Sequence, residues 1–152
     1  MRIALYEPEI AGNVGAVLRL GACLGVPVDL IEPMGFAWDD ARVRRTAMDY
    51  IDHVTVTRHQ GFAEFRETIG EARLILLTTK ADRSLYDAQF EGTDILLFGR
   101  ESAGVPAEVA GACDLNIKIP TVPGVRSLNM AMAAGIAASE ALRQVRPAVI
   151  SA

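Results

Sequence analysis

Short, uninterrupted apolar runs, each followed by a turn and then a helical pattern, constrain this chain more than any other feature of its sequence. Residues 74–78 and Ile95–Phe98 are apolar almost throughout, without the alternation that a half-solvated strand shows. Such runs are typical of strands that are covered on both faces, as in a parallel sheet flanked by helices. Because strand and helix patterns alternate along the chain, we predict a single α/β domain with a mainly parallel sheet.

Periodicity and turn residues assign the remaining elements. Apolar residues at helical spacing predict a helix over Val14–Leu24, with Asn13 as its N-cap and Gly25 as its stop. A closing helix is predicted over Ser127–Gln144. Further strands are expected at residues 3–6, 28–31, 54–56 and 115–119, and further helices at residues 62–69, 106–112 and from Asp39 onward.

Composition limits the size and class of the protein. Of its 152 residues, 51% are hydrophobic, which suits one domain with a full core, placed at residues 1–146 with a frayed tail at 147–152. The sequence shows no signal segment and no apolar run of membrane length, so we expect a cytosolic protein without a membrane partner. Cys23 and Cys113 lack partners at metal-ligand spacing, so reduced thiols and no metal site are expected.

The charge distribution gives a mixed indication about nucleic acid. A net charge of −4 argues against loose, nonspecific binding to nucleic acids. Two local basic clusters are nevertheless present, one at residues 42–45 and one at Arg58 with His59. Taken alone, these clusters suit the solvated surface of helices and loops.

Two loops in the last third of the chain are the strongest candidates for a binding site. One runs from Gly99 to Pro106 and the other from Pro120 to Ser127, and each connects an apolar strand to a helix. Loops in this position are where open α/β sheets bind ligands. We therefore expect one composite site, although each loop by itself could be a plain tight turn or helix cap.

Three local features narrow the chemistry further. The turn around Asn13 lacks the three-glycine spacing of a dinucleotide-binding turn, so a nucleotide-dependent oxidoreductase is remote. Arg19 lies in a helix that otherwise has a buried pattern, where an arginine is paired or functional rather than idle. Ser127 has no histidine near it in sequence, so nucleophilic catalysis is not expected, while pairing in space with His53 or His59 stays open.

Taken together, these segments resemble the SPOUT superfamily of RNA methyltransferases, and within it the single-domain TrmL (YibK-type) branch. The resemblance extends over nearly the whole chain. The segments Ile31–Asp40 and Val56–His59 resemble this branch in particular. Three motifs carry the resemblance to the superfamily: Tyr6-Glu7-Pro8-Glu9-Ile10 with Asn13, Gly15 and Arg19; Leu97-Phe98-Gly99 with Glu101, Gly104 and Pro106; and Ile119-Pro120 with Arg126-Ser127-Leu128-Asn129.

The resemblance implies a C-terminal deep trefoil knot, which neither composition nor periodicity would predict. In this family the loops that correspond to those after Leu77, Phe98 and Ile119 come together and bind S-adenosylmethionine, largely through backbone groups. The residues that the resemblance places against this cofactor are Leu77, Gly99, Ile119, Ser127 and Leu128.

The implied reaction is methyl transfer to the ribose 2′-hydroxyl of the wobble nucleotide, a cytidine or 5-carboxymethylaminomethyluridine, in leucine tRNAs. The motif residues that the resemblance places near the reaction are Arg19, Glu101, Asn129 and Asn13. Because a guanidinium is effectively always protonated, we expect Arg19 to bind a phosphate and stabilise the developing alkoxide. Glu101 would organise hydrogen bonds around the cationic cofactor, Asn129 would tie the loops together, and Asn13 would place the substrate or a loop of the other subunit.

The resemblance also implies partners. It predicts a homodimer through the knot region and the closing helix, whereas the sequence alone equally allows Met132 and Ile136 to be intrachain core. It makes the arginine clusters candidates for holding the anticodon stem-loop of tRNA through phosphates. These candidate RNA-binding residues are Arg42, Arg44, Arg45, Arg58 and Arg126.

The chain departs from the family pattern at one position, and the sequence leaves two alternative functions open. Relatives often carry a tyrosine before the glutamate of the last helix, where this chain has Ser139 before Glu140. The alternatives are a SPOUT methyltransferase acting on another tRNA or ribosomal RNA position, and a noncatalytic RNA-binding protein with the same knot. The intact motif residues, Arg19 and Glu101 among them, favour an enzyme.

Overall fold

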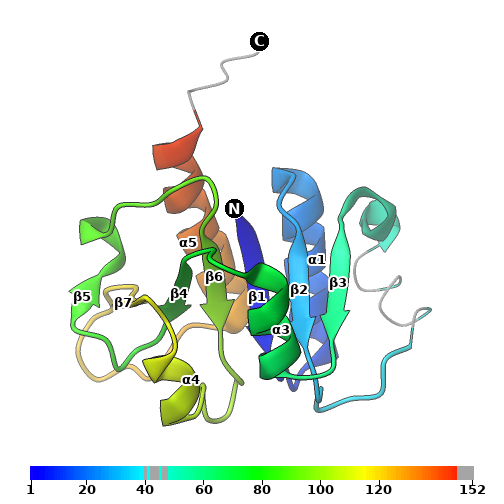
Figure 1. The fold of residues 1–152 in the computed structure, drawn as a ribbon, viewed down its shortest axis with the longest axis horizontal. Helices are drawn as coiled ribbons and strands as arrows, with labels where there is room; N and C mark the ends of the chain where they lie inside the picture. Colours follow the sequence, from blue (N-terminus) through cyan, green and yellow to red (C-terminus); the bar gives the residue numbers. More distant parts are fainter. Residues whose placement is uncertain (40, 42–44, 46–47, 147–152) are drawn as a thin grey trace.

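The computed structural model describes residues 1–39, 41, 45 and 48–146 (Figure 1). Within these residues a single sheet has the strand order β3-β2-β1-β6-β4-β7-β5, and all of its strand pairings are parallel. The predicted α/β class with a mainly parallel sheet is confirmed. The strands are β1 (Arg2–Tyr6), β2 (Val28–Ile31), β3 (Val56–His59), β4 (Leu74–Leu77), β5 (Arg83–Ser84), β6 (Ile95–Phe98) and β7 (Leu115–Lys118).

Helices cover both faces of this sheet, as Figure 1 shows with α3 in front of the strands and α1 behind them. On one face α1 and α5 pack together over β1, β2 and β6, and on the other α3 and α4 cover a second apolar cluster. The helices are α1 (Ala11–Leu24), α3 (Phe62–Ile69), α4 (Ala107–Gly111) and α5 (Met130–Val145), with 3-10 turns η1 (Met48–His53) and η2 (Leu85–Asp87).

The central strands are apolar on both faces because both faces are covered. In β6, Ile95 and Leu97 pack in the cluster under α3, whereas Leu96 and Phe98 pack in the cluster under α1 and α5. All four side chains are buried. Each such side chain contributes about 1.5–3 kcal/mol to folding, so apolar residues are favoured at every position of the strand rather than at alternate ones.

The carboxyl ends of the central strands meet at one edge of the sheet, the lower edge in Figure 1. Phe98 at the end of β6 pairs in register with Leu5 of β1 and with Leu77 of β4, and Leu77 pairs in turn with Ile117 of β7. The chain order changes direction between β1 and β6, because β2 and β3 extend the sheet to one side while β4 and β7 extend it to the other. Open α/β sheets bind their ligands outside such a switch point.

Two helix starts differ from the sequence prediction, and each has a local cause. Helix α1 begins at Ala11 because the extended backbone ends at Ile10, so Asn13 lies in the first turn and is not the N-cap. Helix α5 begins at Met130 rather than Ser127, because the side-chain oxygen of Asn129 accepts from the N–H groups of Ala131 and Met132 and so ends the extended segment there. Ser127 is therefore not a cap.

The third strand was also misplaced by the sequence reasoning. It covers Val56–His59 instead of residues 54–56, because Val28 to Ile31 of β2 pair with these four residues. His59 consequently lies inside the sheet, fully buried against Asp29, and not on a solvated loop. Its Nε2 is 2.8 Å from Oδ1 of Asp29, which also accepts from the guanidinium of Arg2.

Other predictions have mixed outcomes. Gly25 ends α1 in the left-handed conformation with φ 62°, as predicted, and both cysteines are free. Strand β5 was missed because a two-residue strand leaves no pattern in the sequence. Most of the helix predicted from Asp39 and the whole predicted tail at 147–152 lie outside the described residues. Among the helices of the described part, none is both long and apolar enough to cross a membrane.

Candidate functional site

The carboxylate of Glu101 joins two loops at the carboxyl edge of the sheet. One oxygen accepts from the backbone N–H of Glu9 at 2.8 Å, and the other accepts from the N–H of Ile10 at 3.2 Å and from Nδ2 of Asn13 at 3.1 Å. Helix α1 begins directly after these amides, and Ile10 at its N-cap provides no side-chain acceptor. The charge of Glu101 therefore serves as the cap of this helix end, where a negative charge is favourable.

Asn13 extends this contact to the start of the last helix. Its Oδ1 accepts a 2.8 Å hydrogen bond from Nδ2 of Asn129, while its Nδ2 donates to Glu101. The side-chain oxygen of Asn129 in turn caps α5 through the N–H of Ala131 at 2.9 Å. Three of the predicted site residues, from three motifs far apart in sequence, thus form one hydrogen-bonded chain, and both polar atoms of Asn13 are engaged within it.

A second carboxylate, that of Glu9, joins the same two loops, this time with the acceptor on the loop before α1 and the donors on the loop after β6. The carboxylate of Glu9 accepts from the N–H of Ser102 at 2.8 Å and from its hydroxyl at 2.7 Å. These hydrogen bonds from the Ser102 side chain and backbone hold the pKa of Glu9 below its usual value. Sequence reasoning missed this pair, because Glu9 stands in a recognised motif but no spacing relates it to Ser102.

The turn after β6 explains Gly99. Arg100 and Gly104 exchange backbone hydrogen bonds of 3.0 and 2.9 Å, which folds the turn back onto Gly99. A Cβ at Gly99 would lie 2.5 Å from the carbonyl carbon and 2.7 Å from the Cα of Gly104. The glycine is therefore required by the chain's own backbone, and Gly104 itself adopts a positive φ of 68°.

Arg100 anchors the turn to β1. Its guanidinium is 2.9 Å from the carboxylate of Glu7 and lies over the ring of Tyr6, with 5.7 Å between the guanidinium carbon and the ring centroid. Burial raises the pKa of the Tyr6 hydroxyl. Within the described residues, Nε of Arg100 is buried without a hydrogen-bond partner.

The five predicted cofactor residues lie along this edge. Leu77 ends β4, Gly99 follows β6 and Ile119 follows β7, three neighbouring strands, and all three residues are half-buried. Ser127 and Leu128 are exposed and directly precede Asn129, which contacts Asn13. The segment from 120 to 129 is exposed along its length, including the large apolar side chain of Val122 at 69%.

Arg19 is not part of the hydrogen-bonded chain. Six residues separate it from Asn13 in α1, so the two side chains point about 120° apart around the helix. Arg19 is exposed, and its guanidinium carbon lies 5.0 Å from the ring centroid of Tyr50 in η1. The structure thus places Arg19 on a different side of α1 from Asn13, against Tyr50.

Three of the five predicted RNA-binding arginines, Arg45, Arg58 and Arg126, lie in the described part of the chain. Arg45 and Arg126 are exposed, and Arg42 and Arg44 lie outside the described residues. Arg58 is held by neighbours within the chain, since its guanidinium contacts Glu32 at 2.6 Å and lies over Trp38.

The comparisons with known proteins fit this arrangement. The family model described as the SpoU rRNA Methylase family matches residues 1–139. The chain belongs to this family. A tRNA (cytidine(34)-2'-O)-methyltransferase of Beijerinckia indica is 50% identical to this SpoU methylase over 145 residues, which are 94% of this chain and 91% of that protein. A protein of the same name from Escherichia coli K12 is 42% identical over 147 residues, covering 95% and 94%.

A solved structure is similar to this chain in both sequence and fold. It is described as "Structural insights into the 2-OH methylation of C/U34 on tRNA", and it superposes on this SpoU methylase with a TM-score of 0.90. The two chains are 44% identical, and the match covers 94% of each.

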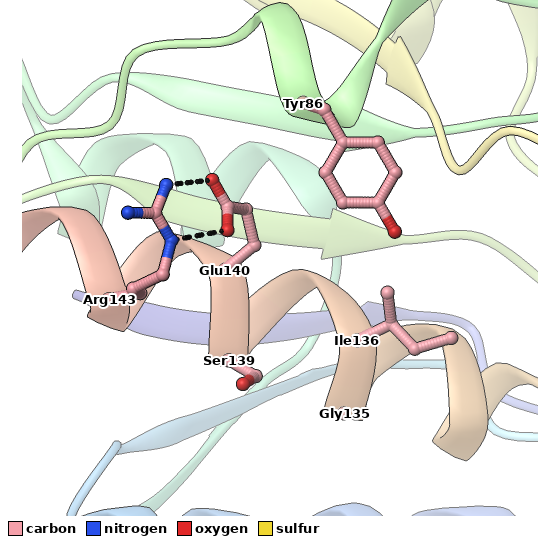
Figure 2. Close-up of a pocket in the computed structure, with 6 residues that line it drawn as sticks. All are labelled: Tyr86, Gly135, Ile136, Ser139, Glu140 and Arg143. Atoms are coloured by element: carbon pink, nitrogen blue, oxygen red, sulfur yellow. Dashed lines mark hydrogen bonds and ion pairs between the residues drawn. The ribbon is translucent and has the colours of Figure 1, made fainter.

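A groove on the surface of this SpoU methylase lies apart from the predicted site. Figure 2 shows it on the exposed side of α5, where Tyr86 of η2 faces Ile136 and where Arg143 pairs with Glu140. Its volume is about 410 Å³. Hydrogen bonds from Arg143 and then Gln144 lower the pKa of Glu140 to about 2. No residue of the predicted site lines this groove.

The titratable groups of the described residues offer no metal centre. No group of three or more histidine, cysteine, aspartate or glutamate side chains in this part of the chain could hold a metal ion. The candidate site instead includes backbone groups, apolar side chains, amides and the carboxylates of Glu101 and Glu9.

Proposed function

We propose that this chain is an S-adenosylmethionine-dependent tRNA methyltransferase. Its substrate is the ribose 2′-hydroxyl of nucleotide 34, a cytidine or 5-carboxymethylaminomethyluridine, in leucine tRNAs of the cytoplasm. The observation that carries the proposal is the chain of Glu101, Asn13 and Asn129, which gathers three motifs of a SpoU methylase at one edge of the sheet. The relatives named for this activity support it, because they match the chain over nearly their full length.

The cofactor site of the proposal lies at the ends of β6, β4 and β7. Leu77 and Ile119 offer half-buried apolar side chains beside the backbone of Gly99, and exposed Leu128 faces solvent before α5. Apolar surface next to strand-end backbone groups suits an adenosine moiety, and the nearby carboxylate of Glu101 suits a cation. S-adenosylmethionine supplies there a methyl group carried on a positively charged sulfur.

The chain's own residues have separate tasks in this scheme. Glu101 holds the loop of Glu9 and Ile10 in place through two backbone hydrogen bonds, and Asn13 and Asn129 fix the loop before α5 against it. Fixing these loops keeps the reacting groups in line, which is the main demand of a methyl transfer. A guanidinium is a poor proton acceptor, so the task of Arg19 is to bind a phosphate and stabilise negative charge on the ribose oxygen.

The proposal includes the trefoil knot. Helix α5 packs against β6 and α1 on one side, and on another side its Gln144 donates to the carbonyl of Ala88 and accepts from the N–H of Phe90. Leu85, Ala88 and Phe90 belong to the same apolar cluster as α5. The segment between β4 and β6 therefore packs against the final helix, and this contact supports the proposal of a chain end that passes beneath a loop.

The proposal also includes a homodimer through α5 and the segment before it. The apolar side chain of Met132 on α5 is 62% exposed, and Val122, Val125 and Leu128 are exposed in the preceding segment. The groove of Figure 2 continues this face along α5 to Ser139. Exposed apolar side chains in and before α5, beside the proposed cofactor site, suit contact with a second copy of the chain, which would share the RNA site.

A methyl-incorporation experiment tests the activity. Total tRNA from a strain that lacks the enzyme is incubated with the protein and labelled S-adenosylmethionine, and the anticodon fragments are analysed by nucleoside mass spectrometry. A 2′-O-methylated pyrimidine at nucleotide 34 is the expected result. Methylation elsewhere in the RNA would keep the enzyme class and overturn the position, and tRNA binding without incorporation would indicate a noncatalytic RNA-binding protein.

A further inference from the structure

Arg58 lies in a compact cluster with Trp38 and Glu32. Nε of Arg58 donates to Oε1 of Glu32 at 2.7 Å, and Nη2 forms an ion pair with the same oxygen at 2.6 Å. One face of the guanidinium covers the indole of Trp38, with 5.1 Å between the guanidinium carbon and the ring centroid. The plane of this guanidinium is therefore fixed by a ring on one side and a carboxylate at one edge.

The parts of Arg58 that remain accessible differ from those of a free arginine. Its side chain is 43% exposed, and Trp38 on one face and Glu32 at the Nε edge leave the outer face and the opposite corner uncovered by these two partners. Glu32 also neutralises the charge at contact distance and would repel a phosphate placed beside it. An uncharged aromatic ring has no such penalty and gains contact with the planar guanidinium.

We propose that the outer face of Arg58 is a stacking platform for a nucleobase of the bound tRNA. Arg58 then recognises RNA through a base plane and not through a phosphate. The inference rests on the proposed function, because it concerns the same RNA. Nucleobases of single-stranded loops, unlike those of a duplex, expose the faces that such a platform needs.

The cluster is joined to the candidate site through the backbone. The N–H of Glu32 donates to the carbonyl of His59 at 2.9 Å, and the N–H of Gly35 donates to the carbonyl of Pro8 at 2.9 Å. A Cβ at Gly35 would lie 2.8 Å from the Cα of Glu9, so these two segments are in close contact. The platform thus borders the loop that Glu101 holds, and the stacked base belongs to the loop that presents the target ribose.

The test compares variants of Arg58 in binding to a leucine tRNA transcript with 2-aminopurine at single positions of its anticodon loop. Arg58→Lys keeps the charge and removes the plane, whereas Arg58→Gln removes the charge. Fluorescence of 2-aminopurine reports stacking, and affinity is measured across a range of salt concentrations. Arg83→Lys, at an exposed arginine on the edge strand β5, is the matched control.

A stacking platform predicts quenching at one loop position in the wild type and in Arg83→Lys, and its loss in Arg58→Lys. The affinity of Arg58→Lys should fall between about 5-fold and about 150-fold, as for the loss of one stacked base. The salt slope of Arg58→Gln should equal that of the wild type. Glu32→Gln, which leaves Arg58 in place, should also keep the wild-type slope.

The opposite result is equally clear. A phosphate contact would leave Arg58→Lys near wild-type affinity and lower the log–log salt slope of Arg58→Gln by about 0.7, and it would steepen the slope of Glu32→Gln. That outcome overturns the platform. The platform is also overturned if the Arg58 variants show the same quenching and affinity as Arg83→Lys. If the wild type methylates nucleotide 34 while the Arg58 variants match it, the platform alone fails. If the wild type neither binds nor methylates tRNA, the proposed function fails with it.

Discussion

The carboxylate of Glu101 can be tested by replacing it with the amide of glutamine, which has the same shape. The carboxylate accepts three hydrogen bonds, from the N–H of Glu9, the N–H of Ile10 and Nδ2 of Asn13. The amide oxygen of Glu101→Gln can keep the two donors on one side, but its NH₂ then faces the N–H of Glu9. One charged hydrogen bond is lost and two become neutral.

The cost follows from typical hydrogen-bond energies. A hydrogen bond to a charged group contributes about 1.5–3 kcal/mol and a neutral one about 1 kcal/mol, so the lower end of the loss is about 2.5 kcal/mol before solvent screening. Glu101 is half-buried, and screening at a partly exposed site reduces this to about 2 kcal/mol. About 2 kcal/mol corresponds to a roughly 30-fold change in a local opening equilibrium. The melting temperature of a domain of this size should fall by about 4–8 °C.

Hydrogen exchange measures this effect where it occurs. The amides of Glu9 and Ile10 should exchange roughly 30-fold faster in Glu101→Gln than in the wild type. Glu67→Gln, at an exposed position on α3, is the control and should change neither amide. Unchanged protection of both amides in Glu101→Gln would refute the reasoning. Glu101→Asp separates position from charge, because it keeps the charge but shortens the reach, and methyl-transfer activity should fall in both variants.

Three further predictions follow from the same geometry. Gly99→Ala should cost about 1–3 kcal/mol, seen as a lower melting temperature, because its Cβ meets the backbone of the next turn; a wild-type melting temperature would contradict this. The pKa of Glu9 is lower in the folded protein than in the unfolded chain, so the stability that its ionised carboxylate contributes is present at neutral pH and is lost as the pH falls through the lowered pKa. Ser102→Ala should raise that pKa toward the ordinary value in an NMR titration. Burial raises the pKa of Cys113 to about 11, so iodoacetamide should modify the exposed Cys23 before Cys113. Peptide mass spectrometry measures the two rates of modification, and equal rates would contradict the prediction.

Elements whose signal is local were predictable from the sequence. The strand at Ile95–Phe98 and the helix at Phe62–Ile69 have the predicted bounds, because an apolar run and an amphipathic period are set by neighbouring residues. The start of α5 was wrong because capping depended on which of two polar residues, Ser127 or Asn129, had the suitable backbone. Local patterns cannot decide such a competition.

The candidate site was predictable in its residues but not in its contacts. The motifs named Glu101, Asn13 and Asn129 but could not show that they bond to one another. The contact of Glu9 with Ser102 joins residues 93 positions apart and has no counterpart in any spacing. Arg58 illustrates the same limit, since its partner Glu32 on the neighbouring strand end decides what its charge can bind.

The cap that Glu101 provides for α1 has a consequence for synthesis of the protein on the ribosome. The first turn of this helix lacks an acceptor of its own at the N-cap and takes one from a residue 92 positions after Glu9. A nascent chain that has emerged only as far as β4 can form α1 but cannot fix its beginning. In the half-made protein α1 therefore lacks its distant acceptor, which Glu101 provides only after β6 docks beside β1.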